Sequence, residues 1–293
     1  MKQDETPFRR FAAEFAGSPV ALAGLALLAL IVLIALLAPL ISPQNPFDLA
    51  RLELLDSRLP PGSRSATGGI YWLGTDDQGR DMLSAIFYGL RTSVGVGMAS
   101  TVFALAIGVS LGLAAAWFGG WTETLIMRLA DLQLSFPSIL IALVLLALLG
   151  QGLDKIILAL VAVQWAYYAR TARASALVER RKEYIEAATC LALSHARIVF
   201  RHLLPNCLPS LIVVAAVQIA AAIMLEATLS FLGLGLPITE PSLGLLISNG
   251  FTYMLSGNYW ISVFPGIALL LAIVSINLVA DRLRDVFNPR LWQ

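Results

Sequence analysis

Long apolar blocks alternate with polar segments along the whole chain. Each block holds about 20 residues or more, the length that an α-helix needs to cross a hydrocarbon layer about 30 Å thick. Lipid offers no hydrogen-bonding partner to an unpaired backbone, so each block is expected to be helical. The pattern predicts an all-α integral membrane protein with six transmembrane helices, over residues 19–41, 92–117, 123–149, 155–177, 208–232 and 259–280.

The first apolar block follows a basic start, as in a secretory signal peptide. The apolar part of a signal peptide is about 7–15 residues long and ends at a small-residue cleavage site. The block at 19–41 is longer, and the sequence after Ala38 continues Pro-Leu-Ile-Ser-Pro. We therefore expect a retained membrane helix.

Basic residues favour the cytoplasmic side of a membrane, and their placement predicts the orientation. With the N-terminus inside, the inside segments carry 14 of the 20 Lys and Arg residues, namely Lys2, Arg9, Arg10, Arg128, Arg170, Arg173, Arg180, Arg181, Lys182, Arg197, Arg201, Arg282, Arg284 and Arg290. Both termini are thus expected in the cytoplasm. The predicted organisation is a cytoplasmic N-terminus (1–18), a first helix (19–41), a periplasmic loop (42–91), a five-helix core (92–280) with a cytoplasmic loop (178–207), and a cytoplasmic tail (281–293).

Composition agrees with this class, because 58% of residues are hydrophobic and only 13% are charged. Soluble domains carry about 25% charged residues. A net charge of +1 gives no field that would attract nucleic acid. The two cysteines, Cys190 and Cys207, lack C-x-x-C spacing and fall in the predicted cytoplasmic region, so neither zinc nor a disulfide is expected.

The cytoplasmic loop between the fourth and fifth apolar blocks is rich in helix-forming residues. Small and aromatic side chains share one predicted helix face at i, i+3, i+4 and i+7 spacing, at Tyr184, Ala187, Ala188 and Leu191. Acidic side chains gather on another face, at Glu179, Glu183 and Glu186. Such a face suits docking into a protein groove, since small side chains allow close approach. The alternative is an amphipathic helix lying on the membrane.

A second short helix is predicted around Ile198–Phe200, and Pro205 predicts a break before the fifth span. With Glu186-Ala187-Ala188, Ala192 and Pro205-Asn206, the loop resembles the EAA loop of ABC importer permeases. The resemblance implies coupling helices that insert into a cleft of an ATPase subunit. The family usually has glycine, which permits a left-handed turn, at the position of Ala192.

Other segments resemble the C-type subunit of the dipeptide, oligopeptide and nickel permeases. These are residues 38–43, 72–93, 226–235 and 241–244, and the likeness runs from about residue 11 to 289. It implies a type I ABC importer permease in the bacterial inner membrane. The implied partners are a second homologous permease, two ATP-binding subunits, a periplasmic solute-binding protein and membrane lipid. It also implies no cofactor in this chain, with ATP and magnesium held by the ATPase subunits.

An acidic cluster precedes the second apolar block, at Asp76, Asp77 and Asp81, with Arg80 among its members. These residues predict a charge-paired turn at the outer mouth. The alternative is a calcium site, although the later bidentate glutamate of an EF-hand loop is lacking.

Polar side chains inside the spans are candidates for the substrate pathway, because such groups are costly in lipid. They are Glu226, Gln218, Gln164 and Asn277. The alternative for the amides is helix–helix hydrogen bonding. For Glu226 it is a structural hydrogen bond or an ion pair, for which Arg91 is the candidate partner.

No G-x-x-x-x-G-K-[ST] phosphate loop and no catalytic constellation occurs in the sequence. The chain is therefore expected to be a transport subunit without its own ATPase. The resemblance implies that it moves di- or oligopeptides. Nickel complexes, glutathione-like solutes and peptide-like antibiotics are the alternative substrates. An ion-coupled transporter working alone would need intramembrane acids or histidines, and only Glu226 qualifies.

Overall fold

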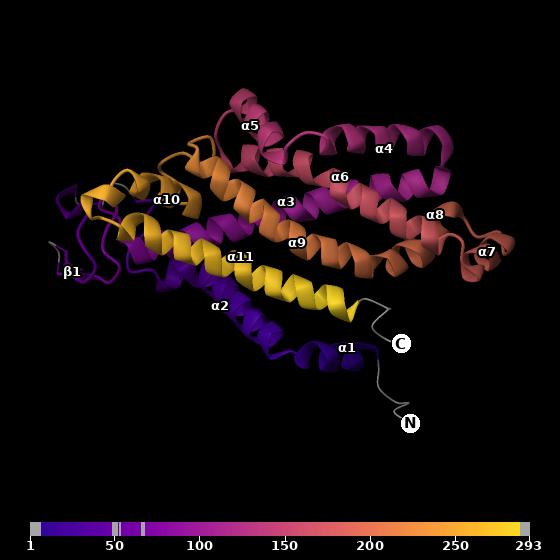
Figure 1. Ribbon diagram of the computed structural model, residues 1–293, viewed down its shortest axis with the longest axis horizontal. Coiled ribbons are helices and arrows are strands. Elements are labelled where there is room, and N and C mark those ends of the chain that lie inside the picture. Colours follow the sequence, from indigo (N-terminus) through magenta and orange to yellow (C-terminus); the bar gives the residue numbers. More distant parts are fainter. Residues whose placement is uncertain (1–6, 49–51, 53, 66–67, 288–293) are drawn as a thin grey trace.

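The computed structural model describes residues 7–48, 52, 54–65 and 68–287 (Figure 1). The α-helices are α1 (Pro7–Ala16), α2 (Pro19–Ile41), α3 (Met82–Phe118), α4 (Gly120–Leu134), α5 (Ser138–Leu149), α6 (Leu153–Glu179), α7 (Glu183–Cys190), α8 (His195–Ile198), α9 (Leu204–Phe231), α10 (Leu243–Phe251) and α11 (Trp260–Val286). Short elements complete the fold: the 3-10 turns η2 (Leu54–Asp56) and η4 (Met254–Ser256), the π-helix η3 (Val199–Leu203), and an antiparallel hairpin of β1 (Ser63–Arg64) and β2 (Ile70–Tyr71).

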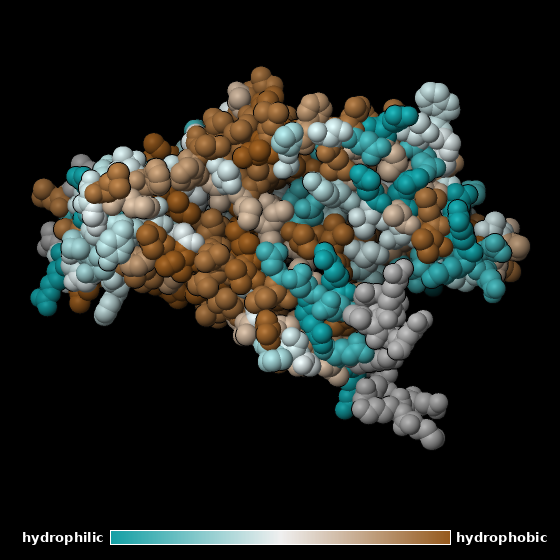
Figure 2. Space-filling model, viewed as in Figure 1, coloured by the Kyte–Doolittle hydropathy of each residue, from teal (hydrophilic) through white to brown (hydrophobic). Residues whose placement is uncertain are grey.

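The long helices α2, α3, α6, α9 and α11 run along the longest axis of the molecule, between two different ends (Figure 1). We call the end formed by residues 54–81 and α10 the hairpin end. The α7 end consists of α7, α8 and the C-terminal turns of α3 and α6. Figure 2 shows a hydrophobic band over the middle of the visible face and hydrophilic residues gathered toward the α7 end. This distribution suits a bundle that crosses a bilayer.

Four helical stretches of the described residues are long and apolar enough to cross a membrane, namely Pro19–Ile41, Met82–Phe118, His195–Phe231 and Trp260–Val286. A fifth is added if α4 and α5 form one span, although they meet at 91°. The helix predicted over 123–149 is therefore divided into α4 and α5. The chain leaves the helix at Ser135, and Pro137 takes an extended conformation just before α5, as expected for a residue that cannot donate the helical hydrogen bond.

Helix α6 is not among these stretches, and its C-terminal half carries Arg170 and Arg173. Both arginines reach across to α4. Arg173 pairs with Glu123, and the Arg170 Nη1 lies 3.7 Å from Asp131 Oδ1. Pairing within the bundle is the usual arrangement for charges at membrane depth.

Helix α3 begins at Met82, ten residues before the predicted start at 92. Asp81 caps it, accepting a 2.8 Å hydrogen bond from the Ser84 backbone N–H. An aspartate at the N-cap satisfies a donor that the first helical turn leaves unpaired. The first turns of α3 thus occupy residues 82–91 of the predicted loop. The predictions for Lys2 and Arg290, and for segments 1–6 and 288–293, lie outside the described residues.

Helices α3 and α6 pack closely against each other. A Cβ atom placed on Gly108 would lie 2.6 Å from the Tyr168 Cβ, and one on Gly112 would lie 2.7 Å from the Ala172 Cβ. Small residues four apart let membrane helices approach this closely. The glycines therefore fix α3 against α6 along their middle turns.

The hairpin end is held together by buried polar contacts. The Tyr71 hydroxyl donates a 2.9 Å hydrogen bond to Asp56, whose carboxylate is buried. The Trp260 indole N–H donates to the Thr75 carbonyl at 3.1 Å, which links α11 to the segment before α3. Because the partners come from distant parts of the chain, these contacts join the loop, α3 and α11 into one unit.

Candidate functional site

The α7–α8 segment projects from the end of the bundle (Figure 1). Lys182 has an extended backbone just before α7, and Glu183 and Glu186 occupy the first turn. Acidic side chains in the first turn interact favourably with the N-terminal end of the helix dipole. The segment is therefore helical where the spacing predicted, over Glu183–Cys190, and the predicted second short helix is present as α8.

Two side chains attach α7 to its own bundle. Ile185 and Ala188 are 3% and 5% exposed, and they pack in a cluster with Leu113 of α3, Ala172 of α6 and Ile198 of α8. The prediction that Ala188 shares an outward docking face is therefore wrong. Helical spacing shows which residues lie together, but it does not show that Ile185 and Ala188 face inward.

The outward surface of α7 carries Glu183, Tyr184, Glu186 and Ala187, and Leu191 follows it. Leu191 is 74% exposed, although leucine is usually buried. Together with the neighbouring small and acidic side chains, it forms a surface that another protein can cover.

Ala192 ends this helix in a left-handed conformation, with φ of 52°. The segment resembles a pattern that has glycine here, and the structure shows why glycine fits. Left-handed geometry costs a residue with a Cβ roughly 1–2 kcal/mol. The turn between α7 and α8 is thus tight and mildly strained.

Pro205 and Asn206 lie in the first turn of α9. The Asn206 side chain donates a 2.7 Å hydrogen bond to the His202 carbonyl. The predicted break at Pro205 is wrong, since α8, η3 and α9 run on as one helical stretch from His195 to Phe231. The wider π turn at Val199–Leu203 accommodates the proline ring, which would otherwise clash with the carbonyl four residues earlier.

Glu179 ties the start of α7 to the end of α6. Its carboxylate accepts hydrogen bonds from Lys182 at 2.7 Å and from the Tyr184 hydroxyl at 2.6 Å. Burial and then the bond to Glu179 raise the pKa of Tyr184. Burial alone would raise the pKa of Glu179, but the bonds from Lys182 and Tyr184 outweigh it and hold that pKa below its ordinary value.

A concavity of about 620 Å³ opens beside the exposed face of α7. Glu186 lies on its rim, and its lining is completed by Trp117, Phe118, Arg180, Ile185, Thr189, Cys190 and His195. Sequence reasoning did not single out Trp117 or Arg180. No local pattern connects two residues that are so far apart in the chain.

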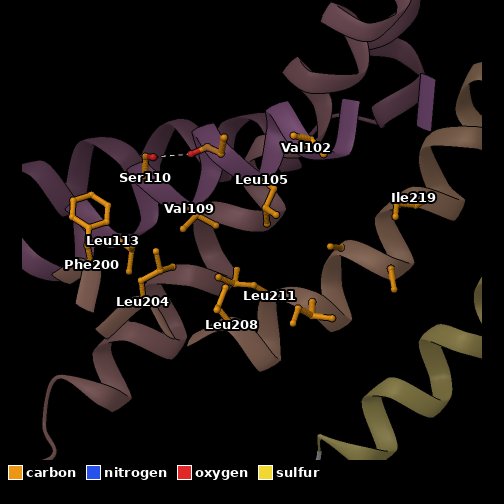
Figure 3. A pocket seen from close by; sticks show the side chains of 14 residues that line it. Val102, Leu105, Val109, Ser110, Leu113, Phe200, Leu204, Leu208, Leu211 and Ile219 are labelled. Carbon is orange, nitrogen blue, oxygen red and sulfur yellow. Dashed lines mark hydrogen bonds between the residues drawn. The ribbon is translucent and has the colours of Figure 1, made fainter. Parts of the chain in front are cut away.

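A second cavity, of about 630 Å³, is an apolar groove between α3 and α9 (Figure 3). Val102, Leu105, Val109 and Leu113 point into it from α3, and Leu204, Leu208, Leu211 and Ile219 do so from α9, with Phe200 at one end. None of the four predicted pathway residues lines this groove.

The predicted pathway residues lie instead between helices. Glu226 is fully buried, and its two carboxylate oxygens accept hydrogen bonds from Ser93 at 2.7 Å and Ser230 at 2.8 Å. The hydroxyls, rather than Arg91, are its observed partners. The Gln164 side chain donates to the Gln218 backbone carbonyl at 2.8 Å, and Asn277 is half-buried on α11.

Within the acidic cluster before α3, the predicted charge pairing is confirmed for Asp76 and Arg80. Arg80 Nε lies 2.6 Å from Asp76 Oδ2, with both side chains fully buried, and an Arg80 Nη1 donates to the Ile238 carbonyl. Burial raises the pKa values of Asp77 and Asp81. Among the described residues, no group of three His, Cys, Asp or Glu side chains is placed to hold a metal ion.

Two protein-family models match this chain, and both describe membrane components of transport systems. Residues 104–293 match the family model described as the binding-protein-dependent transport system inner membrane component. Residues 6–61 match the model described as the N-terminal transmembrane domain of oligopeptide transport permease C.

Curated relatives match over most of the chain. It is 37% identical to the dipeptide transport system permease protein DppC of Haemophilus influenzae over 99% of this chain and 97% of that protein. It is 34% identical to the glutathione transport system permease protein GsiD of Pectobacterium atrosepticum, over 99% of this chain and 93% of that protein. A putative peptide transport system permease protein of Brucella suis is 41% identical, over 79% of this chain and 76% of that protein.

Among solved structures, the inward-facing MetNI methionine ABC transporter contains a similar chain. The TM-score is 0.56 at 22% identity, covering 70% of this chain and 97% of that one. At this identity the likeness concerns the fold, which is that of an ABC importer permease.

Proposed function

This chain belongs to the family of binding-protein-dependent transport system inner membrane components, and we propose that it is the C-type permease subunit of a bacterial importer of di- or oligopeptides. The family consists of membrane permeases rather than ATPases. Relatives similar over nearly the whole chain are named for dipeptide and glutathione transport. A nickel complex or another peptide-like solute is the alternative substrate.

The proposed topology has six membrane passages, with both termini in the cytoplasm of a cell whose inner membrane holds the protein. Helices α2, α3, α4, α6, α9 and α11 alternate in direction between the two ends (Figure 1). The sixth passage comes from counting α4 and α5 as one bent span and including α6. The α7 end carries Arg180, Arg181 and Lys182, and the excess of basic residues favours the cytoplasm. The hairpin end then faces the periplasm and the solute-binding protein.

The single observation that carries the proposal is the exposed α7–α8 pair at the α7 end. Glu186 and Ala187 face outward, the tight turn at Ala192 separates the two helices, and Pro205 and Asn206 continue into α9. We propose that this surface docks on one of two ATP-binding subunits, which hold the ATP and magnesium. Ala188 supports the docking surface from inside.

In this mechanism, closure of the ATPase pair moves α7 and α8, and the attached spans shift between inward- and outward-facing arrangements. A nucleotide can drive this change only because the ATPase pair binds it differently in the two states. The apolar α3–α9 groove is the proposed face toward the second permease, whose helices would enclose the pathway with this chain. The buried Glu226, Gln164 and Gln218 then hold the bundle together, and their partners are those described above.

Reconstitution in proteoliposomes tests the proposal. We expect peptide uptake only when the second permease, the binding protein, the ATP-binding subunits and ATP are all present. Glu186→Arg should abolish uptake and co-purification of the ATPase, because it reverses a charge on the docking surface. Asp154→Arg, a charge reversal at an exposed position outside that surface, should leave both intact. Uptake driven by a proton gradient without the ATPase would refute the proposal.

A further inference from the structure

Helix α3 ends against the α7–α8 segment, although 64 residues separate the two in the chain. Trp117 is the last but one residue of α3, and its indole ring meets the His195 ring edge-on, with 5.4 Å between the ring centroids. His195 is the first residue of α8. Trp117 also packs against the buried cluster that contains Ile185, Ala188 and Ile198. The aromatic contact therefore joins α3 directly to α8, and the buried cluster brings the end of α3 against α7.

Arg180, the residue that follows α6, completes this contact. Its Nη1 donates a 2.7 Å hydrogen bond to the Ala116 carbonyl, one of the carbonyls that the end of α3 leaves without a helical partner. Its guanidinium lies over the Trp117 ring, 5.4 Å from the centroid. A cation over an indole face and at a helix C-terminus is favourable on both counts. The ring is thus held between a charge on one element and a histidine on another.

We propose that Trp117 and Arg180 are positioning residues that transmit movement of the α7–α8 segment to α3. The chain connects α8 covalently to α9 through η3, but it offers no such link to α3. Packed aromatic and charged groups are a physical route by which a displaced surface element can move a distant one. Because α3 and α9 line the apolar groove from opposite sides, a movement of α3 relative to α9 changes its width. This inference rests on the proposed function, and it names the route by which the same surface acts.

The chain provides a matched control. Trp121 lies four residues after Trp117, in the first turn of α4, and is 87% exposed. Replacing either tryptophan by leucine removes the same atoms. Of these two tryptophans, only Trp117 has ring contacts with His195 of α8 and with Arg180 among the described residues.

The test measures peptide taken up per ATP hydrolysed by assembled complexes in proteoliposomes. We expect Trp117→Leu to lower this ratio roughly tenfold, within the range by which substitutions between sites alter coupling, while ATP hydrolysis continues. Trp121→Leu should leave the ratio unchanged, and Trp117→Phe should restore most of it because an aromatic ring remains. A purely structural role for Trp117 would lower the amount of complex without changing the ratio.

Arg180→Gln gives the same test if Trp117→Leu does not assemble, since it removes the charge above the ring and leaves the cluster intact. An unchanged ratio in an assembled Trp117→Leu complex, or in Arg180→Gln where only that variant assembles, overturns the inference. The proposed function stands in that case, provided that the unaltered complex still requires ATP. ATP-independent uptake by the unaltered complex would instead refute the proposed function itself.

Discussion

At the hairpin end, polar side chains find their partners inside the chain, whereas at the α7 end many of them face outward. Asp76, Arg80 and Asp56 are all buried and bonded. On α7, Glu183, Glu186 and Ala187 are exposed, and exposed Leu191 follows. Buried polar groups that lack partners are costly, and most of these buried groups are bonded within the chain, while Arg80 Nη2 and Asp77 Oδ1 have no partner among the described residues.

Glycines strengthen the same contrast. Gly244 of α10 lies so close to α9 that an added Cβ would sit 2.6 Å from the Ala227 Cα. At the α7 end, a left-handed position is filled by Ala192 instead of glycine. We infer that the hairpin end is rigid, whereas the α7 end presents a surface for another protein to bind.

The largest effect is expected from breaking the buried ion pair of the hairpin end. Arg80→Met leaves the Asp76 carboxylate buried without its partner, and such a loss costs about 3–5 kcal/mol. Thermal unfolding of the purified protein should show a large decrease in stability. Arg64→Met, at an exposed position of the hairpin, is the control. Equal stability of the two variants would mean that the pair does not support this end.

A smaller loss is expected where α10 meets α9. Gly244→Ala forces a methyl group against Ala227, and overpacking of this kind costs about 1–3 kcal/mol. Gly95→Ala, in a helix with nothing within 4 Å of the new methyl group, should be neutral or slightly stabilising. Denaturant unfolding of both variants measures the difference. A tolerated Gly244→Ala would show that α10 is loosely attached.

Two alanine-to-glycine changes at the α7 end should have opposite signs. Ala192→Gly relieves the left-handed strain and should stabilise the segment by about 1 kcal/mol. Ala187→Gly, inside α7, should destabilise it by about 0.5–1 kcal/mol because glycine loses more backbone freedom on folding. Hydrogen exchange of residues 183–203 reports both changes. A destabilising Ala192→Gly would contradict the observed backbone conformation.

The smallest expected effect is that lowering the pH changes the stability of the hairpin end and of the α6–α7 junction in opposite directions. Asp77 and Asp81 have pKa values raised above 3.8, so the folded hairpin end binds protons more readily than the unfolded chain and gains stability as the pH falls toward that value. The pKa of Glu179 is lowered below 4.5, so its contribution is complete above 4.5 and is lost as the pH falls through the folded-state value. Hydrogen exchange, corrected for its intrinsic pH dependence, should therefore show the α6–α7 junction loosening first. Earlier loosening of residues 54–81 would contradict this assignment.

The sequence predicted what depends on local pattern. Apolar block length located the helices, and the spacing from Tyr184 to Leu191 located α7. The early start of α3 also had a local signal, since Asp81 and Ser84 have the spacing of an N-cap. The close α3–α6 contact had a local signal as well, because a small residue recurs every four positions at Ala104, Gly108, Gly112 and Ala116.

What the sequence could not show depends on which distant segments meet. Ala188 faces inward because Leu113 and Ala172 cover it, and neither is near it in the chain. The contact between Trp117 and Arg180, and the hydrogen bonds from Ser93 and Ser230 to Glu226, likewise depend on how the helices pack in three dimensions. Burial on one side of a helix is decided by tertiary packing, which periodicity alone does not fix.

Hydrogen exchange of this permease, with and without its ATP-binding subunits, tests the central claim most directly. The account predicts that residues 183–203 gain protection when the ATP-binding subunits are bound, while residues 54–81 exchange at the same rate in both samples. Unchanged exchange across 183–203 in a complex that does contain the ATP-binding subunits would contradict it.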